Sequence, residues 1–404
     1  MGGVYISYPF CSQKCSFCNF ASGVFAPDSI ARYGRRLLED IRVHTWNWQP
    51  ETLYFGGGTP SLIDGSLLRE IFSALPTGSL QEITLECAPG NITSERLNLW
   101  RDVGINRLSL GVQSFVAGEL RQTGRRHTAE IVAQDVTALR SAGIANINID
   151  LIAGLPHQTS ESWRESVQSS IVLGVPHVSV YMLEVDDDSR LGRELIAGGT
   201  RYHAHFVPDE ELTADFYESA CEQLNAAGVA QYEISNFGRE AFQSRHNLKY
   251  WTRQPYLGFG IDAHSMLRST NEAYDAVRFC TPDSLERYVA NAPLQQTQID
   301  SRAGMEETFF LGLRLNEGVS LQLIRQRFGN DVVNALSPTV ADLQAGGLLD
   351  WQGDRIRLTS RGRLLSNEVF ERFLAFHETF VSPVQAGMDH SAISGRSARR
   401  SNIS

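Results

Sequence analysis

Three cysteines near the N-terminus have the type and spacing that most clearly indicate chemistry. Cys11, Cys15 and Cys18 follow a strand-like run in the pattern C-x3-C-x2-C. Thiolates spaced in this way can bind three irons of a 4Fe–4S cluster. No fourth cysteine follows at a comparable spacing, so the fourth iron would be open to another ligand. A structural zinc site or disulfide partners are the alternatives, but structural zinc normally requires four protein ligands.

A glycine-rich segment, GGGTP at residues 56–60, is the second feature that indicates a ligand. Glycines lack a Cβ atom, so that main-chain groups can reach the polar end of a small molecule. An open iron is what S-adenosylmethionine needs in order to chelate through its amino and carboxylate groups. The cysteine spacing resembles that of the radical S-adenosylmethionine enzymes, in which a glycine motif after the second strand binds the methionine amino group. Alone, a glycine triplet more often forms a tight turn.

The elements that must position these residues alternate along the chain. The expected strands are Val4–Tyr8, Thr52–Phe55, Ile83–Glu86, Arg107–Val112, Ile147–Ile152 and His177–Tyr181. The expected helices include Asp28–Trp46, Ala129–Ala142, Ser160–Leu173 and, approximately, Asp209–Ala227. Strand and helix thus alternate about six times, which predicts a parallel sheet with crossover helices. Because this is too few units for a closed eight-fold barrel, we predict an α/β fold with a partial (β/α)6 TIM-like barrel. An open doubly wound sheet is the alternative.

Polar residues fall where these strands end. Glu86 ends the third strand, Gln113 follows the fourth, Asp150 lies on the fifth and Tyr181 ends the sixth. In parallel barrels the chemistry lies at the carboxyl ends of the strands. A carboxylate there requires a cationic or hydrogen-bonding partner, and the ammonium and ribose hydroxyls of S-adenosylmethionine would suit it. Ordinary capping or ion-pair roles are the alternative for each residue.

The alternation is expected to stop near Tyr232, and four segments are predicted. A helix–helix–hairpin pattern follows Met305 and resembles a winged helix, but its expected recognition helix, Pro338–Gly346, contains no Lys or Arg. Nucleic acid is therefore not expected as a partner. The predicted segments are a barrel domain at 1–235, a loop-rich connecting region at 236–302, a winged-helix-like α+β domain at 303–375 and a disordered tail at 383–404.

Composition limits the remaining choices. The chain has 404 residues, 42% of them hydrophobic, and a net charge of −10, so nucleic-acid binding is not favoured by bulk electrostatics. It has no apolar run near the length of a membrane span and no signal-peptide pattern. Six cysteines in such a chain do not form a disulfide framework, which favours the cytoplasm. Cys87, Cys221 and Cys280 are isolated, and we expect each to be a small core residue.

Together, several segments resemble one branch of the coproporphyrinogen-oxidase-like radical S-adenosylmethionine proteins, the HemW-type heme chaperones. The segments are YISYPFCSQKCSFCNF, YFGGGTPS, RLSLGVQSF, GRRH, NIDLIAGLPHQT, YEISNF and HNLKYW, and the resemblance spans roughly residues 4–375. It implies a 4Fe–4S cluster on Cys11, Cys15 and Cys18. It also implies that S-adenosylmethionine is bound by Tyr5, Gly57, Gly58, Thr59, Glu86, Gln113, Arg125, Asp150, Met182 and His264.

Two features distinguish the chaperones from the oxidase that they resemble. The oxidase has a further cysteine two residues after the third, and this chain has Phe20 there. The chaperones have a His-Asn-x-x-x-Trp motif after the barrel, which here begins at His246 and ends at Trp251. The resemblance implies heme as a ligand, and we expect His246, in an open loop, as the axial ligand candidate. A structural His packed near Trp251 is the alternative.

The chain also departs from the family pattern. Ser7 replaces the His of Y-I-H-I-P-F-C, and the E-x-N-P-G pattern is altered around Ala88. A role of the family His near the cluster can therefore not be transferred to this chain.

The function that the resemblance implies is transfer of heme to acceptor hemoproteins, with an electron donor to the cluster as a further partner. A homodimer is compatible with the sequence. Whether the chain is also an enzyme stays open, and coproporphyrinogen III oxidase activity is the alternative function. A winged-helix regulator with a sensory cluster fits poorly with the acidic balance.

Overall fold

The computed structural model describes residues 2–187 and 189–374. The tail expected at 383–404 lies outside these residues. None of the described helices is long and apolar enough to cross a membrane.

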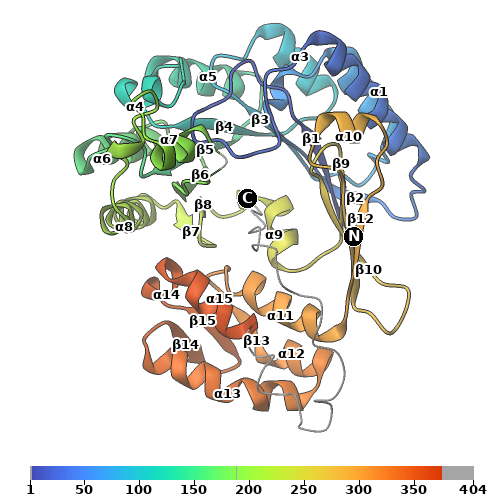
Figure 1. Cartoon of the computed structure of the whole chain (residues 1–404), viewed down its shortest axis with the longest axis vertical. Coiled ribbons are helices and arrows are strands. Elements are labelled where there is room, and N and C mark those ends of the chain that lie inside the picture. The colour runs from blue at the N-terminus through green and yellow to red at the C-terminus, as the bar shows by residue number, and fades with distance from the viewer. Residues whose placement is uncertain (1, 188, 375–404) are drawn as a thin grey trace.

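One large sheet organises the molecule, and its centre is parallel (Figure 1). The six central strands are β1 (Gly2–Tyr8), β2 (Pro50–Gly57), β3 (Glu82–Cys87), β4 (Arg107–Gln113), β5 (Asn146–Ala153) and β6 (His177–Met182). Each pairs in parallel with the next along the chain. The sheet does not close, because β6 pairs antiparallel with β8 (Asn236–Gly238) and β1 pairs with β9 (Tyr256–Phe259). The predicted partial (β/α)6 barrel is confirmed.

Helices of the repeat run along the outer face of the sheet (Figure 1). They are α1 (Pro27–Val43), α2 (Gly65–Ala74), α3 (Ser94–Asp102), α4 (Ala117–Gln122), α5 (Ala129–Ser141), α6 (Ser160–Val172) and α8 (Glu210–Ala226), with short 3-10 turns at Pro60–Leu62 and Ala204–Phe206. Helix α7 (Arg190–Ala197) lies instead against residues 9–26, where the Leu191 N–H donates to the Ser16 carbonyl at 3.0 Å. Helix α1 buries Tyr33, Leu37 and Ile41 on one face, as a period of 3.6 residues requires.

Left-handed glycines separate several helices from the strands that follow. Gly104, Gly143, Gly174 and Gly228 have φ values of 87°, 86°, 64° and 75°. Residues with a Cβ atom rarely adopt this conformation, so a glycine ends the helix and turns the chain into the next strand. These four glycines therefore end helices and lead into the strands that follow, as expected for a parallel sheet with crossover helices.

Residues 236–300 differ from the expected loop-rich region, because they contain further strands of the same sheet. These elements are β8, α9 (Arg245–Trp251), β9, β10 (His264–Arg268), β11 (Ala276–Cys280), α10 (Leu285–Val289) and β12 (Gln295–Ile299), with β7 (Ala230–Gln231) just before them. Strands β10, β11 and β12 form an antiparallel extension beyond β9. Strand β12 is mostly exposed and polar, so it lacks the apolar alternation that predicts a strand.

The C-terminal elements have a core of their own, which includes Phe309, Leu336, Ile356 and Phe373. They are α11 (Ser301–Gly312), β13 (Val319–Ser320), α12 (Leu321–Phe328), α13 (Asn330–Ala345), β14 (Leu349–Gln352), β15 (Arg355–Leu358), α14 (Ser360–Leu364) and α15 (Ser366–Leu374). The expected order of helix, helix and hairpin is present in α12, α13 and β14–β15. The exact domain boundaries stay a prediction.

Candidate functional site

The cysteine loop, residues 9–26, leaves the end of β1 and is closed by its own backbone. The Cys11 N–H donates to the Gly23 carbonyl at 2.8 Å, and the Gly23 N–H donates to the Pro9 carbonyl at 2.8 Å. The Ser16 N–H donates to the carbonyl of Thr123, just after α4, at 3.3 Å. The loop is therefore held at its base and across the sheet, which positions its cysteines beside the carboxyl ends of β1–β6. We call these ends the rim.

The three cysteines of the loop are free thiols, and all are half-buried. Burial raises the pKa of Cys15, and the positive charge of Arg125 partly opposes this rise. Cys18 Sγ lies 3.7 Å from Ser22 Oγ. Among the described residues, ligand atoms close enough to share one metal ion, within 4.8 Å of one another, occur in a different group of side chains. The three loop thiols are not part of that group. One ion needs ligands that close, whereas a cluster distributes its ligands over several irons, so the thiols fit a cluster better.

The glycines at the end of β2 pack against the start of the cysteine loop. A Cβ atom on Gly58 would lie 2.8 Å from the backbone carbonyl carbon of Pro9, closer than side-chain carbons approach other atoms. The Gly58 N–H donates to the Tyr8 carbonyl at 2.8 Å. Gly57 has a φ of 108°, and its N–H donates to Glu86 Oε2 at 3.1 Å. Backbone packing alone thus explains glycine at 58, and a ligand is not needed for that explanation.

Two half-buried carboxylates lie along the rim. Glu86 accepts a hydrogen bond from the Tyr54 hydroxyl at 2.9 Å, and Asp150 accepts from Asn148 Nδ2 at 2.7 Å and from Ser109 Oγ at 3.1 Å. Burial, with the negative charge of Asp150 as the second cause, raises the pKa of Glu86 to about 8. Burial also raises the pKa of Asp150. A cationic ligand at this rim would favour the ionised form of both groups.

Two polar side chains of the rim have atoms without a partner. Gln113 is buried and has a left-handed φ of 70°. In the part of the chain that the structure describes, its Oε1 atom and the Nε atom of Arg125 have no hydrogen-bond partner. Buried polar groups are normally satisfied, so such atoms indicate a polar molecule that completes the site. The two side chains lie close together, because a Cβ atom on Gly111 would lie within 3.6 Å of both.

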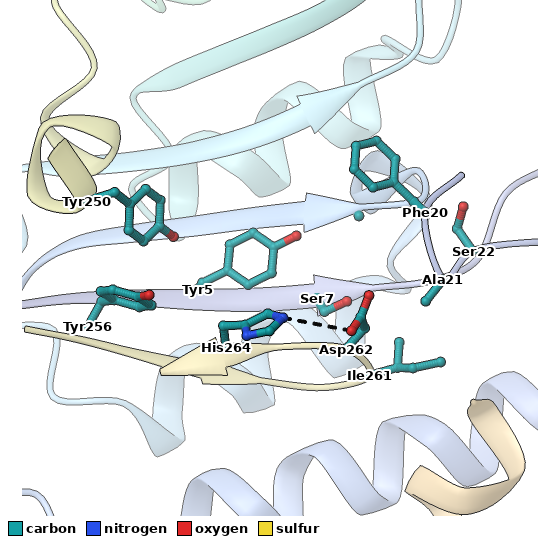
Figure 2. A pocket seen from close by; sticks show the side chains of 11 residues that line it. Tyr5, Ser7, Phe20, Ala21, Ser22, Tyr250, Tyr256, Ile261, Asp262 and His264 are labelled. Carbon is teal, nitrogen blue, oxygen red and sulfur yellow. Dashed lines mark ion pairs between the residues drawn. The ribbon is translucent and has the colours of Figure 1, made fainter. Parts of the chain in front are cut away.

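An open cavity adjoins the rim where β1 and the cysteine loop meet (Figure 2). Phe20, which is 46% exposed, lies on the loop side of this cavity, and the Tyr5 ring lies on β1. The lining residues are Tyr5, Ser7, Phe20, Ala21, Ser22, Gly57, Tyr250, Tyr256, Ile261, Asp262 and His264. Four aromatic rings therefore line the cavity, together with the polar side chains of Ser7, Ser22, Asp262 and His264.

The structure brings most of the expected S-adenosylmethionine residues to the rim but divides them between two places. Tyr5, Gly57 and His264 line the cavity, while the remaining polar residues follow the strand ends beyond it. The hydrogen bond between Gly57 and Glu86 links the two places. Met182, half-buried at the end of β6, is not among the cavity-lining residues.

His246 differs from the expected residue of an open loop. It lies on helix α9 and is 1% exposed. Its Nδ1 atom lies 2.8 Å from Thr52 Oγ1, and its Nε2 atom lies 2.8 Å from the Tyr250 hydroxyl. Its backbone N–H donates to Glu82 Oε1 at 2.9 Å. Burial lowers the pKa of His246 to about 3. The ring is neutral, but neither nitrogen is available to an iron in this conformation.

The tryptophan of the same motif is also inaccessible. Trp251 is 3% exposed, and the guanidinium of Arg314 lies 4.3 Å from the centre of its ring. It therefore cannot provide a flat surface for a porphyrin here. Tyr250, by contrast, lies on the cavity wall, where its ring can provide the flat apolar surface expected of the motif's Tyr and Trp.

A second group was missed because two of its members, His264 and Cys280, lie on strands that the sequence did not predict. Asp262, His264 and Cys280 have ligand atoms that all lie within 4.8 Å of one another. Cys280 was expected in the core, but it lies half-buried on β11, directly opposite His264 on β10. Burial, followed by the charge of Asp262, raises the pKa of Cys280 to about 11. Only the pairing of the two strands, sixteen residues apart at this point, reveals the group.

The comparisons with known proteins agree with this geometry. The Radical SAM superfamily model matches residues 5–169, which include the cysteine loop and the glycines of β2. The chain is therefore a radical S-adenosylmethionine protein, a class that implies a 4Fe–4S cluster and S-adenosylmethionine. A model of the HemN C-terminal domain matches residues 299–365.

Curated relatives extend this result to nearly the whole chain. The Heme chaperone HemW of Lactococcus lactis is 33% identical over 92% of this chain and 96% of its own length. That of Bacillus subtilis is 31% identical over 93% and 99%, and that of Escherichia coli is 29% identical over 92% and 98%. The chain belongs to the family of HemW-type radical S-adenosylmethionine heme chaperones.

Among solved structures, a coproporphyrinogen III oxidase (HemN) from Escherichia coli has the same fold. It superimposes with a TM-score of 0.79 over 92% of this chain and 89% of that chain. The sequences are 22% identical, so this likeness shows the fold and not the activity.

Proposed function

We propose that this protein binds a 4Fe–4S cluster, S-adenosylmethionine and heme, and transfers heme to acceptor hemoproteins. The observation that carries the proposal is the full-length similarity to heme chaperones, which includes the C-terminal domain. Phe20 supports it, because a bulky apolar side chain occupies the loop position at which the resembled oxidase has a further cysteine.

Cys11, Cys15 and Cys18 would hold the cluster. Together with S-adenosylmethionine, the bound cluster supplies one-electron reductive cleavage of a sulfonium. The chain's own contribution is to fix the loop through the backbone bonds at Cys11, Gly23 and Ser16.

The residues that we propose for S-adenosylmethionine act by charge and hydrogen bonding. Glu86 and Asp150 would attract its cationic groups, and the unpartnered Oε1 of Gln113 and Nε of Arg125 would gain partners. The complete proposed set is Tyr5, Gly57, Gly58, Thr59, Glu86, Gln113, Arg125, Asp150, Met182 and His264.

Heme would use the aromatic wall of the cavity. Tyr5, Phe20, Tyr250 and Tyr256 provide apolar ring surfaces for a porphyrin. His246 can act as an axial ligand only if its ring leaves Thr52 and Tyr250, so the proposal for His246 includes a movement of α9. Acceptor hemoproteins and an electron donor are the proposed partners, and we propose the cytoplasm as the location, because free thiols are favoured in a reducing compartment.

The alternative function, coproporphyrinogen III oxidation, is supported by the shared fold. The deciding experiment uses anaerobically reconstituted full-length protein. In one arm the protein is loaded with heme and mixed with an apo-hemoprotein, and transfer is followed by the Soret absorbance of the acceptor. In the other arm it receives coproporphyrinogen III, S-adenosylmethionine and reductant, and protoporphyrinogen IX is measured.

We expect heme transfer faster than spontaneous release from albumin-bound heme, and no decarboxylation. Decarboxylation with multiple turnovers would overturn the chaperone assignment. Heme that stays on the protein in the presence of apo-acceptor would overturn the transfer step.

A further inference from the structure

The pairing of β10 with β11 places Cys280 opposite His264, a residue that also belongs to the set proposed above for S-adenosylmethionine. His264 and Cys280 are directly opposite each other in the antiparallel register, so their side chains leave the same face of the sheet. Asp262 precedes His264 in a turn where its own φ is 51°. The His264 ring and the Asp262 carboxylate point toward each other at the edge of the cavity (Figure 2).

The distances between the three side chains match the ligands of one small ion. His264 Nε2 lies 3.9 Å from Asp262 Oδ1 and 3.6 Å from Cys280 Sγ. A tetrahedral ion with bonds of about 2.0–2.3 Å separates neighbouring ligand atoms by roughly 3.3–3.8 Å. The Asp262–His264 contact is an ion pair when the imidazole is protonated, and its 3.9 Å is longer than a hydrogen bond.

The backbone around the group is fixed before any ligand arrives. The Ala263 N–H donates to Thr281 Oγ1 at 2.7 Å, and the Thr281 N–H donates to the Ala263 carbonyl at 3.1 Å. The Thr281 hydroxyl also donates to the Gly260 carbonyl at 2.6 Å. These bonds join the turn that carries Asp262 to the end of β11. The backbone that carries the three metal ligands is therefore in place before a metal binds.

We propose that Asp262, His264 and Cys280 form an accessory site for a divalent transition metal of the zinc class. One oxygen, one imidazole nitrogen and one thiolate are ligands that Zn²⁺ accepts, and the two anionic ligands balance its charge. Three protein ligands leave the fourth position open, and Asp262 and His264 line the cavity, so that position faces the cavity. On binding, the thiol proton of Cys280 is released to solvent.

The test uses full-length protein with the cluster reconstituted, so that Cys11, Cys15 and Cys18 are occupied by iron. Zn²⁺ is titrated anaerobically in competition with a chromophoric chelator, without S-adenosylmethionine or heme. We expect about one tight site per chain, weakened by more than about tenfold in His264→Ala and in Cys280→Ser. The matched control is Cys221→Ser, a half-buried cysteine on α8, which should bind Zn²⁺ as the wild type does.

A second measurement identifies the thiolate directly. In the full-length Cys11→Ala/Cys15→Ala/Cys18→Ala chain, Co²⁺ should produce a thiolate-to-cobalt charge-transfer band that Cys280→Ser removes and Cys221→Ser retains. Zn²⁺ binding that is unchanged in Cys280→Ser, or a Co²⁺ spectrum without a band that depends on Cys280, would overturn the site. Because neither measurement uses S-adenosylmethionine or heme, failure here is distinguishable from failure of the proposed function.

Discussion

At the scale of single residues, the six cysteines fall into different environments. Cys11, Cys15 and Cys18 share one loop, whereas Cys87 is buried in the core of the barrel and Cys221 lies half-buried on α8. Burial raises the pKa of Cys87 to about 12 and is the main cause that raises the pKa of Cys221 to about 11. Position in the fold, and not residue type alone, therefore decides which thiols can bind iron.

Replacement of Cys11, Cys15 or Cys18 by Ala should each abolish loading of the 4Fe–4S cluster, because each removes one of only three ligands. Cluster content is measured by iron and sulfide analysis and by visible absorbance after anaerobic reconstitution. Cys221→Ala is the matched control and should load normally. Full loading of any of the three loop variants would mean that the ligands are misassigned.

Glu86 should make the unliganded protein less stable as pH rises. Its folded pKa of about 8 exceeds the value near 4.3 of an unfolded Glu, so the folded state holds more protons between these two pH values. The stability that its neutral form provides is complete below about pH 4 and is lost as pH rises toward 8. Glu86→Gln should flatten the fall of the thermal midpoint between pH 5 and 8.

The control for that measurement is Glu95→Gln, the same chemical change in the exposed first turn of α3. It should retain the wild-type pH dependence. A Glu86→Gln profile parallel to that of the wild type would show that another group causes the slope.

At the scale of secondary-structure elements, helix α9 is held against the barrel through one imidazole. The His246 ring forms hydrogen bonds with Thr52 on β2 and with Tyr250 in the same helix, and the His246 backbone N–H donates to Glu82 on β3. Lys249 adds an ion pair to Glu51 at 2.6 Å. Exposure of His246 requires the loss of its hydrogen bonds to Thr52 and Tyr250. Heme ligation through His246 would therefore require helix α9 to move away from the barrel.

Two substitutions separate a structural from a ligand role of His246. Tyr250→Phe removes the partner of Nε2 and retains the imidazole, so it should leave heme affinity unchanged or increase it if His246 ligates iron. His246→Ala should then weaken heme binding and shift the Soret band, and it should lower stability by about 1–3 kcal/mol because Thr52 and Tyr250 lose a buried partner.

Heme titration and thermal unfolding of both variants, with the cluster loaded, provide the measurements. Equal heme affinity in His246→Ala and the wild type would leave the motif with a structural role only.

At the scale of the whole molecule, a buried ion cluster joins the sheet extension to the C-terminal elements. Arg253, 1% exposed, bonds Glu307 on α11 at 2.7 Å and Asp275 beside β11 at 2.7 Å. Arg278 and Arg327 complete the cluster from β11 and α12. A backbone bond from the Ile234 N–H to the Arg314 carbonyl, at 3.1 Å, adds a second connection. The C-terminal elements are thus attached to the barrel by charge as well as by packing.

Glu307→Gln should destabilise the protein by about 3 kcal/mol, because it removes one of the two carboxylates that compensate the buried guanidinium of Arg253. Glu317→Gln is the control, since its pair with Arg355 is exposed and contributes less than about 1 kcal/mol. Chemical denaturation of the two variants measures the difference. Equal stability of both variants would show that the cluster does not hold the two parts together.

The sequence alone was sufficient for the partial barrel and for the cysteine and glycine motifs. These features depend on local patterns: apolar periodicity, a glycine after each helix, and ligands within a few residues of one another. The tertiary structure decided what local patterns do not contain. The burial of His246 depends on Thr52, nearly two hundred residues away, and the metal-ligand group depends on the register of β10 with β11. The edge strands were missed because exposed polar residues satisfy a ladder of backbone bonds without any apolar period.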